Sequence, residues 1–199
     1  RDKSENTSEI QYKLYEFAIE KDILTFSNDE PLHHIMFANI VANAISLNKI
    51  KETREFIEKY KFRLAPERAE SAVNLNMAKV YFKEKNYKEA LSCLSVVRQD
   101  DVFYKVAMKN LYAMIYYESS LTEELFLLLD SYRSFLSSNV VIGEKLKDNH
   151  FNFVSTLTKL LKLKDVGEKS EIQYLKFETE AVKSLLSKQW LIEKMNELL

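Results

Sequence analysis

The feature that most constrains the fold of this chain is its shortage of turn-forming residues. The 199 residues include two glycines and two prolines. A strand-rich fold needs turn residues about every 8–12 positions, and glycine and proline supply many of them. Apolar residues make up 46% of the chain, which is enough for a continuous core. We therefore expect an all-α protein with no strands.

The spacing of apolar residues predicts a series of helices separated by short polar segments. The first expected helix, about 8–26, carries on one side Ile10, Leu14, Phe17, Ala18 and Leu24. The polar segment at 27–31 is expected to end this helix and cap the next, because Asn and Asp side chains accept hydrogen bonds from free amides and proline suits a first turn. The later expected helices are 32–47, 50–64, 67–84, 87–98, 102–118, 122–136 and 142–163, followed by a final segment that contains Trp190.

Short connections predict how these helices are arranged. Asp100 and Asp101 are expected to cap the helix at 102–118 at its positive end, and the chain should turn again at Gly167. Most connections are two to six residues long, so consecutive helices should be antiparallel neighbours. Because no long linker interrupts the series, we expect residues 1–199 to form a single domain.

Charge and hydropathy argue against two classes of partner. Lys and Arg total 29 against 30 Asp and Glu, without the basic excess that a nucleic-acid binder uses to displace counterions. No apolar run approaches the roughly 18 residues that span a bilayer. We therefore expect no direct contact with nucleic acid and no membrane span.

The cellular location is poorly constrained. The single cysteine, Cys93, rules out an internal disulfide and fits a reducing compartment, which favours the cytoplasm without fixing it. The chain opens RDKSENTSEI, with neither an initiator Met nor an apolar leader. We expect a fragment of a longer protein or a processed product, so that a signal peptide or further repeats could precede it.

The stretch AKVYFKEKNYKEALSCL, residues 78–94, recurs in a weaker form along the chain. A shift of 35 residues places Ala78 on Ala113 and Tyr81 on Tyr116. A shift back by 34 residues places Ala44 under Ala78. A small residue on the first helix of a hairpin lets the second helix pack closely, and the aromatic residue three positions later fills the gap between units. A period near 34 residues is typical of tetratricopeptide repeats.

The chain therefore resembles the tetratricopeptide-repeat family, and it is also similar to divergent bacterial repeat proteins of unknown function. The resemblance is best in the central unit, at Ala78, Tyr81, Ala90, Leu94 and Val97. It implies a right-handed α-solenoid of antiparallel hairpins, with units at about 37–70, 71–104 and 106–139 and capping helices at 140–199. The opening helix would be half of an earlier unit or an N-terminal cap. The family's Trp-x-x-Leu-Gly opening is absent, and an irregular helical bundle is the alternative fold.

No residue pattern in this chain indicates catalysis. His33 and His34 are adjacent and point about 100° apart on a helix, so they cannot chelate one metal as an i, i+4 pair does. Cys93 is flanked by apolar residues and is expected to be a small buried hydrophobe. Two glycines leave little room for a phosphate-binding loop or a nucleophile elbow. We expect no enzyme activity, no metal and no cofactor.

The family resemblance implies a concave groove lined by the first helix of each unit. Carried onto this sequence, the groove positions that we expect to bind a partner are Lys79, Phe82, Lys83, Asn110, Met114, Tyr117 and Glu118. The same positions include Leu75 in the central unit and, in the first, Val41, Ile45, Asn48 and Lys49. The alternative, that Phe82 and Tyr117 are buried packing residues, stays open.

Three functions are compatible with these sequence features. The first is a non-catalytic protein-interaction scaffold that presents a groove to a peptide or helix of a protein partner, with self-association possible. The second is a helical regulatory or sensor domain attached to a DNA-binding or signalling module outside this sequence. The third, a helical-bundle enzyme, would require a bound metal or cofactor.

Overall fold

The computed structural model describes residues 3–25, 27, 30–98 and 101–199. Contacts divide the chain into two compact units, Arg1–Gln99 and Asp100–Leu199, which are taken one at a time below. The described residues form α-helices, one short 3-10 helix and no strand, and Leu32 and Leu64 make an isolated parallel bridge. The all-α prediction is confirmed, whereas the single domain stays a prediction.

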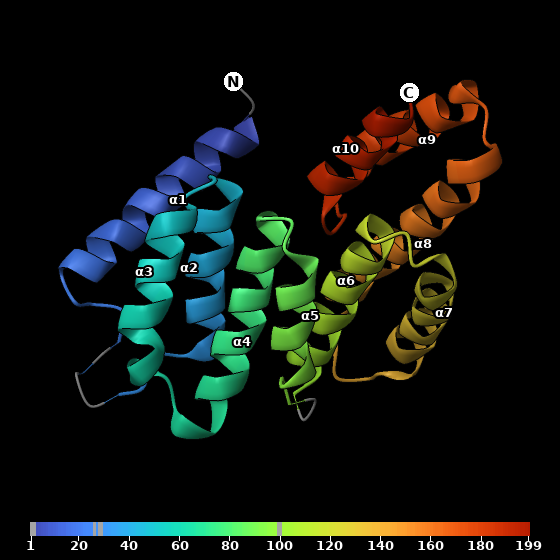
Figure 1. Cartoon of the computed structure of the whole chain (residues 1–199). Helices are drawn as coiled ribbons and strands as arrows, with labels where there is room; N and C mark the ends of the chain where they lie inside the picture. Colours follow the sequence, from blue (N-terminus) through green and yellow to red (C-terminus); the bar gives the residue numbers. More distant parts are fainter. Residues whose placement is uncertain (1–2, 26, 28–29, 99–100) are drawn as a thin grey trace. The chain divides into compact units, whose positions relative to one another are not determined.

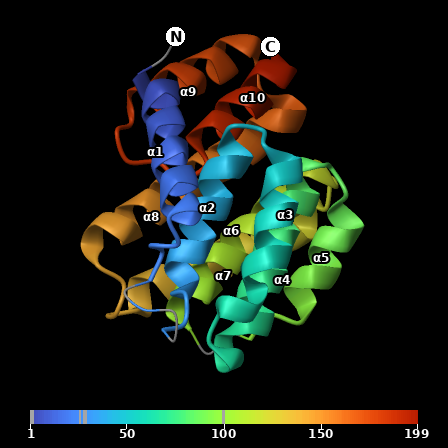
Figure 2. The same cartoon turned by 90° about the vertical axis from the view of Figure 1, so that its left-hand side faces the viewer.

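The described residues of the first unit form five α-helices and the 3-10 helix. These elements are α1 (Lys3–Glu20), α2 (His34–Ser46), α3 (Ile50–Tyr60), η1 (Lys61–Arg63), α4 (Pro66–Lys83) and α5 (Tyr87–Ser95). Helix α2 packs between α1, α3 and α4, and α5 pairs with α4 (Figure 1). Helix α1 lies along α2 at the edge of the unit (Figure 2).

The described part of the second unit forms another five helices. They are α6 (Val102–Glu118), α7 (Thr122–Ser138), α8 (Glu144–Val166), α9 (Lys169–Ala181) and α10 (Lys188–Leu198). Helix α7 packs against α6 and α8, and α10 packs against α8 and α9. The final segment of the sequence thus forms two helices. Across the described ranges, no helix is long and apolar enough to cross a membrane.

Most expected helix boundaries are confirmed within a few residues, and the caps show where they differ. The side chain of Asp101 accepts a hydrogen bond from the Phe103 amide at 2.7 Å, as expected, while Asp100 lies outside the described residues. The cap of α2 was expected in the 27–31 segment. It is instead His33, whose Nδ1 accepts from the Ile35 amide at 3.3 Å, and Asn28 and Asp29 lie outside the described residues.

The same turn closes three hairpins, α2–α3, α4–α5 and α6–α7. A residue with left-handed backbone follows the first helix each time: Asn48, Lys85 and Ser120, with φ of 59°, 60° and 56°. In the middle hairpin the Lys85 amide donates to the Phe82 carbonyl at 2.9 Å, and the Asn86 amide donates to the Tyr81 carbonyl at 2.8 Å. The other two turns have the same pair of hydrogen bonds. This is the Schellman motif, which satisfies the last carbonyls of a helix.

The spacing of these turns tests the sequence alignment of the hairpins. Lys85 and Ser120 lie 35 residues apart, the same shift that aligns Ala78 with Ala113. Asn48 and Lys85 lie 37 residues apart, three more than the shift that aligns Ala44 with Ala78. The turns therefore align Val41 with Ala78. The longer helix of this hairpin accounts for the extra length, since α3 has 11 residues against 9 in α5, whereas the connection at 61–65 is no longer than the one at 96–101.

The first helix packs with the face opposite to the one that the sequence pattern highlights. Ile10, Leu14 and Phe17 are exposed, whereas Tyr12, Tyr15 and Ile19 line a cavity of about 60 Å³ against α2 and α3. Its expected end at 26 is also wrong, since α1 ends at Glu20. Helix α1 is apolar on two sides, so periodicity alone does not tell which side meets the core.

Small residues allow close packing at the expected places. Ala78 on α4 and Ala113 on α6 are both fully buried, as their repeat positions predict. Gly167 makes the expected turn between α8 and α9, and a Cβ atom there would lie 2.6 Å from the Leu163 carbonyl oxygen. Any larger residue at this position would push the backbone of the α8 terminus aside.

Candidate functional site

The seven predicted partner-binding residues lie on two helices, α4 in the first unit and α6 in the second. On α4, the side chains of Lys79 and Phe82 are half-buried and that of Lys83 is exposed. The Phe82 ring contacts the Tyr87 ring at the start of α5, with centroids 5.8 Å apart. Three groove residues on α4 therefore form a partly open surface that combines two cations with an aromatic ring.

Lys79 has an unusual environment for a cation. Its Nζ donates to Oδ1 of Asn76 at 3.0 Å, and the buried Asn76 amide in turn donates to the Ala72 carbonyl at 2.8 Å. Desolvation lowers the pKa of Lys79 to about 8, because the neighbouring amide oxygen carries no full negative charge to offset it.

On α6, the ring of Tyr117 lies in the interior of the second unit. It is 6% exposed, forms a T-shaped pair with the Trp190 ring at a centroid distance of 5.4 Å, and has Lys164 Nζ 4.7 Å from its centroid. The Trp190 ring also contacts Phe153 of α8, with centroids 6.4 Å apart. Tyr117 is therefore part of an aromatic cluster between α6, α8 and α10.

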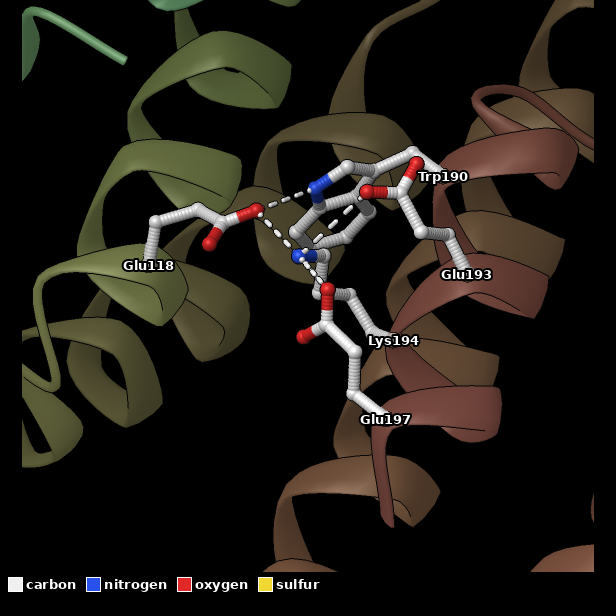
Figure 3. Close-up of polar contacts among 5 residues, drawn as sticks. All are labelled: Glu118, Trp190, Glu193, Lys194 and Glu197. Carbon is white, nitrogen blue, oxygen red and sulfur yellow. Dashed lines mark hydrogen bonds and ion pairs between the residues drawn. The ribbon is translucent and has the colours of Figure 1, made fainter. Parts of the chain in front are cut away.

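Glu118, the last residue of α6, links this cluster to two polar groups of α10 (Figure 3). Its Oε1 accepts from Trp190 Nε1 at 2.8 Å and lies 2.9 Å from Lys194 Nζ. The carbonyl end of a helix disfavours a carboxylate, because the helix dipole is negative there. The indole and ammonium donors offset that cost, so Glu118 depends on α10.

Lys194 is the centre of a group of carboxylates. It is 3% exposed, and its Nζ lies 2.6 Å from Glu197, 2.9 Å from Glu118 and 3.7 Å from Glu193. Burial acts to lower the pKa of Lys194, but hydrogen bonds to Glu197 and Glu118, with their charges, outweigh it and raise the pKa above its usual range. The side chain is therefore firmly charged and fully paired.

Asn110 and Met114 face the residue that precedes α10. Asn110 Nδ2 donates to Ser187 Oγ at 3.2 Å, and Ser187 Oγ donates to Met114 Sδ at 3.4 Å. Ser187 has left-handed backbone with φ of 52°. Met114 is buried, while Asn110 is half-buried. Both residues are therefore engaged by the chain's own C-terminal segment.

The four predicted residues of α6 thus contact α10 and the residue before it. Met114 and Tyr117 are both buried, which agrees with the alternative that Tyr117 is a packing residue and not part of an open groove. Trp190 was expected only as part of a cap, and no role was predicted for Lys194. A lysine four residues after the single tryptophan was the available signal, since the i, i+4 spacing puts both on one helix face.

A second buried polar pair was not evident from the sequence. The Tyr132 hydroxyl of α7 donates to the Val106 carbonyl of α6 at 3.0 Å and hydrogen-bonds His150 Nδ1 of α8. Because the hydroxyl proton is directed to Val106, His150 donates to Tyr132 from Nδ1. Desolvation lowers the pKa of His150 to about 4, so the ring is neutral near pH 7. The two residues lie 18 positions apart, too far for a local pattern to connect them.

The other candidates for chemistry give no concentrated site. Cys93 was expected to be buried, but its side chain is only half-buried. Desolvation raises the pKa of its thiol. Among the described residues, no group of three His, Cys, Asp or Glu side chains is placed to hold a metal. An open groove of about 520 Å³ runs between α8 and α9, with Lys159, Lys162 and Glu178 beside Tyr174.

Comparison with known proteins gives no relative for this chain: no family model, curated protein or solved structure matches it. The class that the fold of the described residues defines is an all-α protein.

Proposed function

We propose that this protein is a non-catalytic interaction scaffold whose α4 face, defined by Lys79, Phe82 and Lys83, binds a peptide or helix of a partner protein. The observation that carries the proposal is the contact between α6 and α10. There, two side chains at the predicted groove positions contact a helix that packs on α8 and α9: Tyr117 meets the Trp190 ring, and Glu118 pairs with Lys194. The corresponding α4 face remains partly open, since Phe82 is half-buried and Lys83 is exposed.

The repeat relationship supports the comparison of the two faces. The shift of 35 residues that superposes the Schellman turns of α4 and α6 places Phe82 on Tyr117 and Lys83 on Glu118. The 35-residue spacing of the α4 and α6 turns, which equals the shift that aligns Ala78 with Ala113, supports a tetratricopeptide-like solenoid of antiparallel hairpins. The turn itself is a common helix end and also follows α1, at Asp22, so only its spacing supports the repeat.

The difference in charge between the two faces indicates the kind of partner. Glu118 receives a lysine of α10, whereas its counterpart Lys83 would receive a carboxylate. Lys79, whose hydrogen-bond partner is a neutral amide oxygen, also favours a negatively charged group on the partner. The expected partner segment therefore carries an aromatic or large apolar residue and an acidic residue four positions later on one helix face.

A peptide derived from α10 tests this directly. A labelled peptide with the sequence of residues 188–198 and the substitution Lys194→Glu should bind the intact protein saturably, as measured by fluorescence anisotropy. Phe82→Ala and Lys83→Glu should each weaken binding about tenfold or more, since each removes one of the two anchors. The unmodified α10 peptide should bind less well, because its lysine would face Lys83.

Capture of natural partners from the native cell gives the second test. The double variant Phe82→Ala/Lys83→Glu should lose partners that the wild-type protein retains. The matched control is Phe62→Ala/Lys51→Glu, which changes an exposed aromatic residue of η1 and an exposed lysine of α3 in the same unit. Undiminished capture by a folded Phe82→Ala/Lys83→Glu variant would exclude the α4 face as the site.

A further inference from the structure

Helix α1 has apolar side chains on two opposite faces. The inner face contributes Tyr12, Tyr15 and Ile19 to the cavity against α2 and α3, and it anchors the helix to the first unit. Burial, together with the charges of Glu16 and Glu52, raises the pKa of Tyr12 to about 12, which agrees with a packed position. These inner side chains therefore hold α1 alongside α2, the arrangement of the two helices that Figure 2 shows.

The outer face of α1 is an apolar stripe that the described residues of the unit leave open. Ile10, Leu14 and Phe17 are 54%, 62% and 53% exposed. Their spacing of four and three residues places them in one line along the helix. Lys21 continues the line, with its Nζ 5.9 Å from the centroid of the Phe17 ring. A helix that is apolar on two sides is typical of one with neighbours on both.

Charged residues border this stripe along one edge. At 100° per residue, Lys13 and Glu20 lie on the same side of the line through Leu14, seven residues apart. The other side is bordered by Gln11 and Ala18, which carry no charge. The stripe thus has one charged edge with opposite signs at its two ends and one neutral edge.

We propose that this stripe, Ile10, Leu14, Phe17 and Lys21, binds the same stripe of a second copy of the chain in an antiparallel, two-fold symmetric pair. An antiparallel two-fold pair brings each edge against the same edge of the second copy. Leu14 then packs against Phe17 of the second copy, and the stem of Lys21 covers Ile10. The same register places Lys13 opposite Glu20 of the second copy, twice.

Charge complementarity favours a second copy of the chain as the partner of the stripe, in the antiparallel orientation. In the antiparallel pair both charged contacts join opposite signs, as between the flanking positions of a coiled coil. A parallel pair would set the charged edge of one helix against Gln11 and Ala18 of the other and would leave both charges unpaired. A second copy therefore matches the stripe in shape and in charge.

The size of the stripe sets the strength of the pair. A standard stable interface buries about 800 Å² on each partner, more than three or four side chains of one helix can supply. The dimer should therefore be weak and should dissociate on dilution. Sedimentation velocity over a wide concentration range measures this, since a reversible dimer shifts its mean sedimentation coefficient with concentration.

Charge reversal tests the register. Lys13→Glu and Glu20→Lys should each weaken self-association about tenfold, because two like-charge contacts replace two favourable ones. An equimolar mixture of these two variants should associate about as well as the wild type. In the mixed pair, a chain with glutamates at positions 13 and 20 faces a chain with lysines at both positions. The double variant Lys13→Glu/Glu20→Lys should also recover association, whereas Leu14→Glu should abolish it.

Controls on the rest of the surface separate this stripe from others. Lys88→Glu on α5 and Leu127→Glu on α7 change an exposed lysine and an exposed leucine and should leave association unchanged. A wild-type chain that stays monomeric at the highest concentration would overturn the proposal. So would a dimer that survives Leu14→Glu, which must use another surface. Failure of the mixed variants to associate would overturn the antiparallel register.

Discussion

Lys194 Nζ lies 2.9 Å from Glu118 Oε1 and joins the last residue of α6 to the middle of α10. The two residues are far apart in the sequence, and the same Glu118 oxygen accepts a hydrogen bond from Trp190 Nε1, whose ring contacts that of Tyr117. The ion pair and the indole hydrogen bond therefore link α6 to α10 through side chains.

The first prediction concerns this ion pair. Lys194→Met should lower the free energy of unfolding by about 3 kcal/mol, because it leaves the carboxylate of Glu118 without its cation at a helix end that disfavours negative charge. Chemical denaturation measures the change. The matched control Lys162→Met removes an exposed lysine of α8 and should change stability by less than about 0.5 kcal/mol.

A double-mutant cycle tests whether the loss of stability in Lys194→Met arises from the unpaired carboxylate of Glu118. The variant Lys194→Met/Glu118→Gln should be more stable than Lys194→Met alone, because the neutral amide oxygen still accepts from Trp190 Nε1. Strict additivity of the two single substitutions would show that the two side chains do not interact.

The second prediction contrasts Tyr117 and Phe82, two aromatic residues that the 35-residue shift aligns. Tyr117→Ala should cost about 3–5 kcal/mol, the usual range for a large buried aromatic side chain. Phe82→Ala should cost clearly less, because its ring is half-buried. Thermal unfolding of both variants measures the difference. Equal losses would mean that Phe82 is a core residue and would remove it from the proposed α4 face.

The third prediction concerns the Schellman turns. Lys85→Gly should stabilise the protein by about 1 kcal/mol, because glycine adopts the left-handed backbone at φ 60° without the steric cost that a lysine incurs. Ser120→Gly should act in the same direction. Lys162→Gly, within α8, should instead destabilise by about 1 kcal/mol. A loss of stability in Lys85→Gly would contradict the assigned turn geometry.

The fourth prediction is a pH dependence that arises from His150. Its pKa is lowered to about 4 in the fold, against about 6.5 in the unfolded chain. Between these values the unfolded state binds more protons, so stability falls as the pH drops from about 6.5 to about 4. The loss from this residue reaches at most about 3 kcal/mol.

The variant His150→Asn isolates this contribution. Asparagine can donate to Tyr132 from a position near that of Nδ1, but it does not titrate. The difference in unfolding free energy between wild type and variant should therefore change across this pH window, whereas the titration of carboxylates is common to both. A constant difference from pH 7 to pH 4 would show that His150 does not become charged on unfolding.

Local sequence patterns predicted most of the helices, although they did not divide the final segment into α9 and α10. The few glycines and prolines, the apolar spacing and the polar stops at Asp101 and Gly167 predicted the class and most boundaries, because capping and periodicity depend on residues close together in the chain. The alignment of Ala78 with Ala113 was also correct as a pair of buried small residues.

Which helix faces are covered could be learned only from the packed fold. The sequence pattern of α1 highlighted Ile10, Leu14 and Phe17, but the opposite face meets α2, since a helix with two apolar sides can pack with either. Tyr117 and Glu118 likewise occupy groove positions by their spacing, yet they contact Trp190 and Lys194 of α10. Periodicity fixes the direction in which a side chain points from its own helix. Which helix packs opposite that side chain depends on contacts with residues more than 70 positions away in the sequence.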